Sequence, residues 1–179
     1  PLNFGRSWRL GKGDLFVVEG DEYDTAFFDK GSKFLHYRPQ TAIITSVELD
    51  HVDIFASLDA IKDAFRKFVA LIPADGLCVV AADSPGALEV VRGAGCKVES
   101  YVVRDVEHPD AQADWVARAI ATRPGGRTLF EVTRGGKPFG VFDTALPGGY
   151  NLANALAVIA ACASRGLSAE LIGRGIQIG

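Results

Sequence analysis

Up to residue 105, apolar positions gather in short runs that are separated by longer amphipathic stretches. Four runs have the length and the β-branched or aromatic content of buried strands: residues 15–19, 41–45, 77–81 and 97–103. Between them, residues 57–72 repeat an apolar side chain every three to four positions, which predicts a helix capped by Ser57. Ser84 and Pro85 offer an N-cap and a first helical residue for a second helix. Strands alternating with helices predict an α/β domain with a mainly parallel sheet flanked by helices.

A different pattern follows residue 105. Residues 128–133 and 138–143 flank the turn sequence RGGK at 134–137, which predicts an antiparallel hairpin that extends the sheet. Residues 111–122 indicate a weaker helix or helical turn. Residues 151–164 are Ala-rich and are closed by Gly166, which predicts a helix, and Ser168 starts a last short one.

Composition is typical of one folded domain with a sizeable core, since 48% of the 179 residues are apolar and 23% are charged. The net charge of −3 argues against a nucleic-acid partner, but it leaves room for a nucleotide, which needs only local donors or a metal. No apolar stretch reaches about eighteen residues and no signal peptide opens the chain, so we expect no membrane partner. The three cysteines form no C-x-x-C pair, which favours buried thiols in a reducing cytoplasm.

The two ends of the chain predict that it is a piece of a longer protein. The sequence contains no Met, and it stops at Gly179, directly after a predicted helix.

Polar side chains follow two of the predicted strands. Glu19 ends the strand at 15–19, and Asp50 and His51 follow the strand at 41–45. If these strands are parallel neighbours, Glu19 and His51 meet at one edge of the sheet, where ligands bind in open α/β folds. A carboxylate and an imidazole are a reasonable partial shell for Mg²⁺ or Mn²⁺. The alternative is a plain polar loop, in which these residues have no ligand.

The start of the helix at 151–164 is a second candidate site. Asn151 and Asn154 are three positions apart and share one helix face, where their amides can meet a base or a ribose. The alternative is an Asn N-cap followed by one polar helical residue. Neither a G-x-x-x-x-G-K-[ST] phosphate loop nor a G-x-S-x-G elbow occurs in the chain.

Three motifs resemble the signatures of the central domain of the Mur ligases, the ATP-dependent amide ligases of peptidoglycan synthesis. They are EGDEYD at residues 19–24, DHVD at 50–53 and GYNLANALA at 149–157. The run DTAFFDK at 24–30 most resembles the branch of the family that acts in wall recycling. That branch joins UDP-N-acetylmuramate to the murein tripeptide L-alanyl-γ-D-glutamyl-meso-diaminopimelate.

The resemblance implies that residues 1–179 are one central ATPase domain of a three-domain enzyme. A UDP-sugar domain and the phosphate loop would precede it, and a C-terminal domain would follow. In such ligases ATP phosphorylates the UDP-muramoyl carboxylate, an amine attacks the acyl phosphate, and phosphate leaves. Mg²⁺ neutralises the phosphoryl charge. The enzyme would be cytoplasmic, and the piece alone would be inactive.

Site residues are implied by the same resemblance. Glu19 matches the magnesium ligand, and His51 matches the histidine of a second metal site. Asn151 and Asn154 match the asparagines at the adenine end of ATP, with Tyr150 beside them. Asp50 would orient His51 from behind.

Three positions depart from the family pattern. The family usually has histidine where Tyr150 stands, and an asparagine is common where Ser46 is found. Sister ligases carry a carbamylated lysine at the position that corresponds to Phe65. The aromatic residue there is shared by the branches that add to UDP-N-acetylmuramate itself. Two alternatives therefore stay open beside the tripeptide ligase: a central domain of a UDP-N-acetylmuramate–L-alanine ligase, and a domain that binds a nucleotide-sugar or a partner without catalysis.

Overall fold

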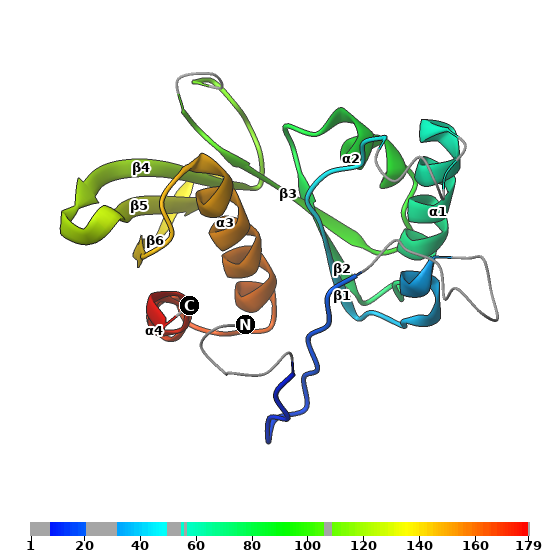
Figure 1. The fold of residues 1–179 in the computed structure, drawn as a ribbon, viewed down its shortest axis with the longest axis horizontal. Helices are drawn as coiled ribbons and strands as arrows, with labels where there is room; N and C mark the ends of the chain where they lie inside the picture. The colour runs from blue at the N-terminus through cyan, green and yellow to red at the C-terminus, as the bar shows by residue number, and fades with distance from the viewer. Residues whose placement is uncertain (1–7, 21–31, 50–54, 56, 106–108, 179) are drawn as a thin grey trace.

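The computed structural model describes residues 8–20, 32–49, 55, 57–105 and 109–178, and its strands form one sheet (Figure 1). The strand order is β1-β2-β3-β4-β5-β6. Strands β1 to β4 are parallel, and β4, β5 and β6 are antiparallel. Their bounds are β1 Thr41–Ile44, β2 Leu77–Ala81, β3 Lys97–Val103, β4 Trp115–Arg123, β5 Arg127–Arg134 and β6 Lys137–Thr144.

Helices cover both faces of this sheet. The α-helices are α1 Leu58–Ala70, α2 Pro85–Val90, α3 Gly149–Ser164 and α4 Ala169–Ile178, and short 3-10 helices span Lys33–His36 and Pro124–Gly126. Figure 1 shows α1 and α2 on one side of β1, β2 and β3, and α3 on the other. α3 contacts all four parallel strands, and α4 contacts β6. No helix in the described ranges is long and apolar enough to cross a membrane.

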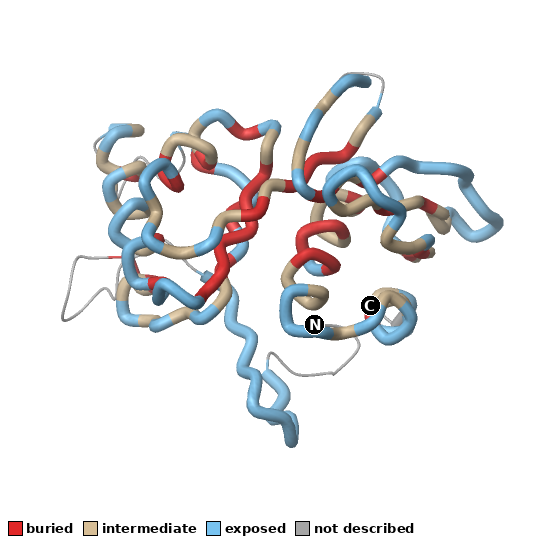
Figure 2. Tube along the Cα trace, turned by 180° about the vertical axis from the view of Figure 1, so that it is seen from behind, coloured by how far each residue is buried: buried red, intermediate tan, exposed pale blue. Residues whose placement is uncertain are grey.

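Strand β2 is buried along its whole length and separates two cores (red in Figure 2). Leu77, Val79 and Ala81 point into a core under α3, here called the α3 core. Cys78 and Val80 point into a core under α1 and α2, the α1 core. This arrangement follows from the pleat of a strand, which sends successive side chains to opposite faces. A continuous apolar run is therefore what a central parallel strand requires.

Serine side chains cap the first turns of α1 and α2. The Ser57 hydroxyl accepts a hydrogen bond of 3.2 Å from the Ala60 amide, and Ser84 accepts one of 3.4 Å from the Ala87 amide. Such caps satisfy amides that have no partner within the helix. The predicted strands at 41–45, 77–81 and 97–103, the helices that begin after Ser57 and Ser84, the hairpin, and the two C-terminal helices are all confirmed.

The helix or helical turn expected at residues 111–122 is wrong, because most of this segment belongs to strand β4, Trp115–Arg123. β4 pairs with β3 in parallel and with β5 in antiparallel fashion, so both of its edges are hydrogen-bonded. Trp115 and Ala117 are completely buried in the α3 core. The two ladders and this burial outweigh the helix preference of the alanines.

The strand expected at residues 15–19 is also absent. In the described part of the chain the sheet ends at β1, and no ladder reaches this segment. Phe16 is 80% exposed and Val17 is 92% exposed. A short apolar run becomes a strand only where another strand completes its hydrogen bonds, and the described residues offer none here.

Candidate functional site

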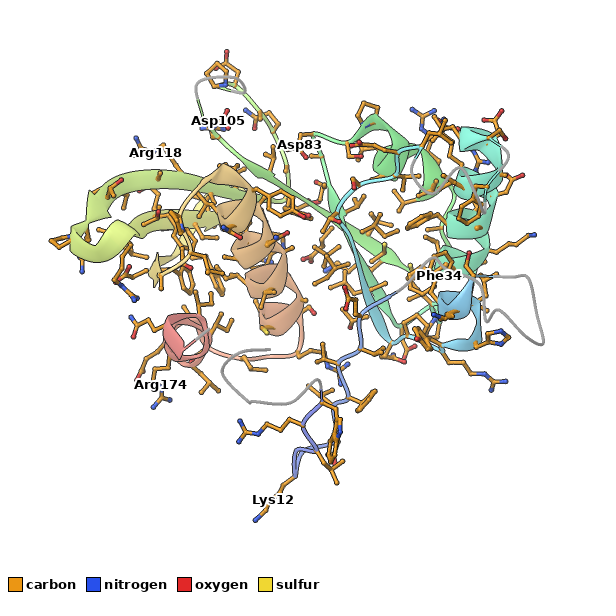
Figure 3. The ribbon with its side chains drawn as sticks, in the orientation of Figure 1. Lys12, Phe34, Asp83, Asp105, Arg118 and Arg174 are labelled. Atoms are coloured by element: carbon orange, nitrogen blue, oxygen red, sulfur yellow. The ribbon has the colours of Figure 1, made fainter. Side chains whose placement is uncertain are left out.

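The carboxyl ends of the parallel strands form the edge of the sheet where a ligand is expected. β1, β2 and β3 end at Ile44, Ala81 and Val103, and their parallel pairing brings these ends to one side. Figure 3 shows Asp83 and Asp105, which follow β2 and β3, at this edge, and Lys12 at the opposite end of the molecule. α3 also begins at this edge (Figure 1). Ligands of open α/β sheets bind in this position.

The first turn of α3 has no side-chain cap. Its N-cap is Gly148, whose φ of 97° lies in the left-handed region, and no side chain accepts from the first amides of the helix. Those amides therefore remain available to a ligand. The turn that precedes α3 is fixed in another way, because the Asn151 amide nitrogen donates a hydrogen bond of 2.8 Å to the Pro147 carbonyl. Asn151 is thus a residue that shapes the site entrance as well as a candidate ligand contact.

Tyr150 and Asn154 are the next two polar side chains to consider at this helix start. They are four positions apart and so lie on one helix face. Tyr150 is 77% exposed, and Asn154 is half-buried. Within the described ranges no hydrogen bond occupies the Asn154 amide. A flat aromatic surface beside a free amide suits a planar heterocycle that carries both donors and acceptors.

Sequence reasoning missed Tyr101, a residue of β3. Its ring is 2% exposed and packs in the α3 core. Burial, the charge of Asp83 and then that of Tyr150 raise the pKa of Tyr101 to about 12. Tyr101 therefore stays neutral at physiological pH. The only signal in the sequence was Asp83, a carboxylate two residues beyond the end of a buried strand.

Glu19 is described, but it is not joined to a site. It is exposed, and no hydrogen bond or ion pair links it to another residue in the described ranges. Its expected partners His51 and Asp50 lie outside the described residues. Among the residues that are described, no group of three His, Cys, Asp or Glu side chains could hold a metal ion. The metal site that the sequence suggests therefore stays a prediction.

Phe65, at the position where sister ligases carry a modified lysine, has an apolar role. Its ring lies 5.2 Å from that of Phe34, and Phe68 lies 4.9 Å from the same ring. This aromatic group packs against the α1 core. Ser46, the other described departure, is exposed in the segment after β1.

Comparison with known proteins identifies one family. Residues 9–162 match the family model described as Mur ligase middle domain. UDP-N-acetylmuramate–L-alanyl-γ-D-glutamyl-meso-2,6-diaminoheptandioate ligase of Haemophilus influenzae is 38% identical over 169 residues, which are 94% of this chain and 35% of that protein. UDP-N-acetylmuramate–L-alanine ligase of Caldanaerobacter subterraneus is 33% identical over 93% of this chain and 33% of that protein.

A solved structure agrees with these relatives. The crystal structure of UDP-N-acetylmuramate:L-alanyl-γ-D-glutamyl-meso-diaminopimelate ligase from Neisseria meningitides matches with a TM-score of 0.73 and 39% identity. The match covers 90% of this chain and 46% of that one. The chain spans about a third of the length of these two curated relatives, 35% of the first and 33% of the second.

Proposed function

The chain belongs to the Mur ligase family, as its middle domain, and on that premise we propose that it is the ATP-binding domain of a murein tripeptide ligase. The enzyme would join UDP-N-acetylmuramate to L-alanyl-γ-D-glutamyl-meso-diaminopimelate. We choose the tripeptide ligase because the chain is 38% identical to a ligase of that name across 94% of its length. The L-alanine ligase of Caldanaerobacter subterraneus, at 33%, supports the second candidate.

ATP would bind at the carboxyl edge of the sheet, against the start of α3. Tyr150 would lie against the adenine ring. Asn154 and the oxygen of Asn151 would contact the polar edge of the base. The structure supports this role because Tyr150 is exposed, Asn154 is unbonded among the described residues, and the helix start is uncapped. When bound, ATP supplies the phosphoryl group that activates the muramoyl carboxylate for attack by an amine.

Mg²⁺ would be held by Glu19 and His51, with Asp50 orienting the imidazole. Carboxylate oxygen is a preferred magnesium ligand, and one or two protein ligands suffice because water and phosphate complete the shell. The exposed Glu19 carboxylate has no competing partner among the described residues, which suits a ligand role. A reaction that consumes ATP and a UDP-linked sugar belongs in the cytoplasm, so we place the enzyme there.

The test is phosphate release by the full-length enzyme that contains this domain. The enzyme is given ATP, Mg²⁺ and UDP-N-acetylmuramate, and then either the tripeptide or L-alanine. We expect release with the tripeptide and none above background with L-alanine. Release with L-alanine alone would replace the tripeptide by the second candidate. No release with either amine would favour a domain that binds a nucleotide-sugar or a partner without catalysis.

A further inference from the structure

Asp83 lies at the carboxyl edge as a direct result of strand register. Ala81, the last residue of β2, is paired with Tyr101 of β3, and the Ala82 amide donates a hydrogen bond of 2.8 Å to the Tyr101 carbonyl. Asp83 is the next residue, so it is the first one beyond the ladder. Its side chain is exposed, and Figure 3 shows it at the upper edge of the sheet.

Tyr101 reaches the same place from inside the fold. Its ring packs in the α3 core with Leu152 and Leu156 of α3. No residue in the described part of the chain hydrogen-bonds its hydroxyl. The buried side-chain atoms without a partner there are Ser32 Oγ and Arg104 Nε, so the Tyr101 oxygen is not sealed in the core and meets solvent. The Tyr101 hydroxyl is therefore available to donate a hydrogen bond to a ligand at this edge of the sheet.

Strand register and helix packing bring Tyr101 to the same part of the edge as Asp83 and Tyr150. Ala81, two residues before Asp83, pairs with Tyr101, and Leu152, two residues after Tyr150, packs in the same core as Tyr101. After burial, the charges of Asp83 and Tyr150 raise the pKa of Tyr101 further. This agrees with the register of β2 and β3 and with the packing of α3 on β3. An unbonded hydroxyl that meets solvent, an exposed carboxylate and an exposed aromatic ring therefore share one corner of the sheet.

The charge of this corner decides which part of a nucleotide it can receive. The Asp83 carboxylate repels phosphate and accepts hydrogen bonds from hydroxyl or amino groups. Tyr150 and Asn154 already suit the base. The remaining neutral part of a nucleotide is the ribose, whose vicinal hydroxyls are commonly bound by a carboxylate in dinucleotide-binding folds. The alternative is that Asp83 is merely a solvated residue in front of the Ser84 cap.

We propose that Asp83 and Tyr101 form a ribose subsite, in which Asp83 accepts hydrogen bonds from the 2′ and 3′ hydroxyls and the Tyr101 hydroxyl donates to a ribose oxygen. This rests on the proposed function, because it assumes that a nucleotide binds at the start of α3. It adds two residues that neither the three sequence motifs nor the predicted site contains. It also assigns a use to the Tyr101 hydroxyl, which the fold itself leaves unbonded.

The test is calorimetric binding of ATP, 2′-deoxyATP and 3′-deoxyATP to the full-length protein. Asp83→Asn is the decisive variant, because the side chain is exposed and its loss leaves the core intact. Tyr101→Phe removes only a hydroxyl. The matched controls are Asp75→Asn, at the other end of β2, and Tyr37→Phe, beside the 3-10 helix Lys33–His36. Asn154→Ala reports on the base subsite.

We expect Asp83→Asn to weaken ATP binding about tenfold, as for a hydrogen bond to a charged group, and Tyr101→Phe to weaken it about fivefold. In Asp83→Asn the deoxy analogues should bind no more weakly than ATP, because the partner of the missing hydroxyl is already gone. If Asn154→Ala weakens ATP binding while Asp83→Asn and Tyr101→Phe do not, the ribose subsite is rejected and the proposed function stands. If the unmodified protein binds no ATP, the proposed function fails, and this inference fails with it.

Discussion

The indole nitrogen of Trp115 donates a hydrogen bond of 2.7 Å to the buried carboxylate of Glu99. The same carboxylate contacts Arg134 at 2.9 Å and Lys97 at 2.6 Å. The Arg134 guanidinium also lies 4.8 Å from the centre of the Trp115 ring. Glu99 is on β3, Trp115 on β4 and Arg134 on β5. One carboxylate thus ties the parallel part of the sheet to the hairpin.

Replacing Glu99 should destabilise this junction. Burial raises the pKa of Glu99, but hydrogen bonds from Lys97, Trp115 and Arg134 outweigh it, so the pKa lies below its ordinary value. Glu99→Gln leaves two cationic partners without their anion, and we expect a loss of about 1–3 kcal/mol in the free energy of unfolding at pH 7. Urea unfolding followed by tryptophan fluorescence measures this loss. Glu131→Gln, which breaks an exposed pair with Arg118, is the control and should change stability by under about 1 kcal/mol.

The same carboxylate predicts a dependence of stability on pH. Because its pKa is lower in the folded state, its contribution is present above the unfolded value of about 4.3 and is lost as the pH falls through the folded value. The urea midpoint of the unmodified protein should therefore fall below pH 4.3 more steeply than that of Glu99→Gln. If the urea midpoint falls equally steeply with pH in the two proteins, Glu99 does not cause this pH dependence.

Asn151 should help the site to prefer ATP over GTP. Its amide nitrogen is committed to the Pro147 carbonyl, so the side-chain oxygen is the atom left for a ligand. An oxygen accepts from the 6-amino group of adenine, whereas guanine presents an acceptor there. We expect Asn151→Ala in the full-length enzyme to raise the KM for ATP more than it lowers kcat, and to narrow the ATP-to-GTP ratio of kcat/KM.

The control for Asn151 is Gln112→Ala, which removes an exposed amide bonded to the Asp110 carbonyl, far along the chain from α3. It should leave both nucleotides unaffected. An unchanged KM for ATP in Asn151→Ala would return this residue to a purely structural role at the helix start.

Glu19→Ala should abolish metal-dependent turnover and leave the fold intact. Glu19 is exposed and unbonded among the described residues, so its loss removes no packing. The measurement is ATP turnover by the full-length enzyme across a titration of Mg²⁺ and then Mn²⁺. Glu170→Ala, an exposed carboxylate in the first turn of α4, is the control. Normal turnover with an unchanged metal requirement would reject the ligand role of Glu19.

Gly86→Ala should disturb the segment that leads to His51. A Cβ at Gly86 would meet the backbone carbonyl of Val47, which has little freedom to yield. We expect a loss of about 1–3 kcal/mol in stability from this overpacking. If His51 is a ligand, metal binding should also weaken, so that half-maximal turnover requires a higher Mg²⁺ concentration. Gly95→Ala, where nothing lies near the added methyl, is the control and should be neutral or slightly stabilising.

The parts of the fold that the sequence predicted are those that local chemistry determines. Ser57 and Ser84 cap helices through hydrogen bonds to amides only three residues away, and the glycines at 135 and 136 supply the positive φ of a hairpin turn. Strand β4 was missed because its identity depends on partners on both sides, which a run rich in alanine does not reveal. The segment at 15–19 was misjudged for the opposite reason, since its apolar side chains have no described partner.

The residues of the candidate site also differ in whether the sequence alone could suggest them. Asn151, Asn154 and Tyr150 could be proposed from the sequence because they are close together in it and begin one helix. Tyr101 could not, because a tyrosine inside a strand has the pattern of any core residue. Its proposed role follows only from the register of β2 and β3 and from the packing of α3 on β3, which the sequence does not display.

Strand β2 gives side chains to both cores, and this bears on how the molecule comes apart. If α1 and α2 detach, Cys78 and Val80 lose their cover, and if α3 detaches, Leu77 and Val79 do. If either helix layer detaches alone, it exposes one face of β2, the strand that also packs against the other layer. The two layers are thus expected to unfold in one cooperative transition, with the slowest amide hydrogen exchange along β2. The ligand edge would then rest on the least mobile strand of the domain, while the residues that contact the ligand lie just beyond its end.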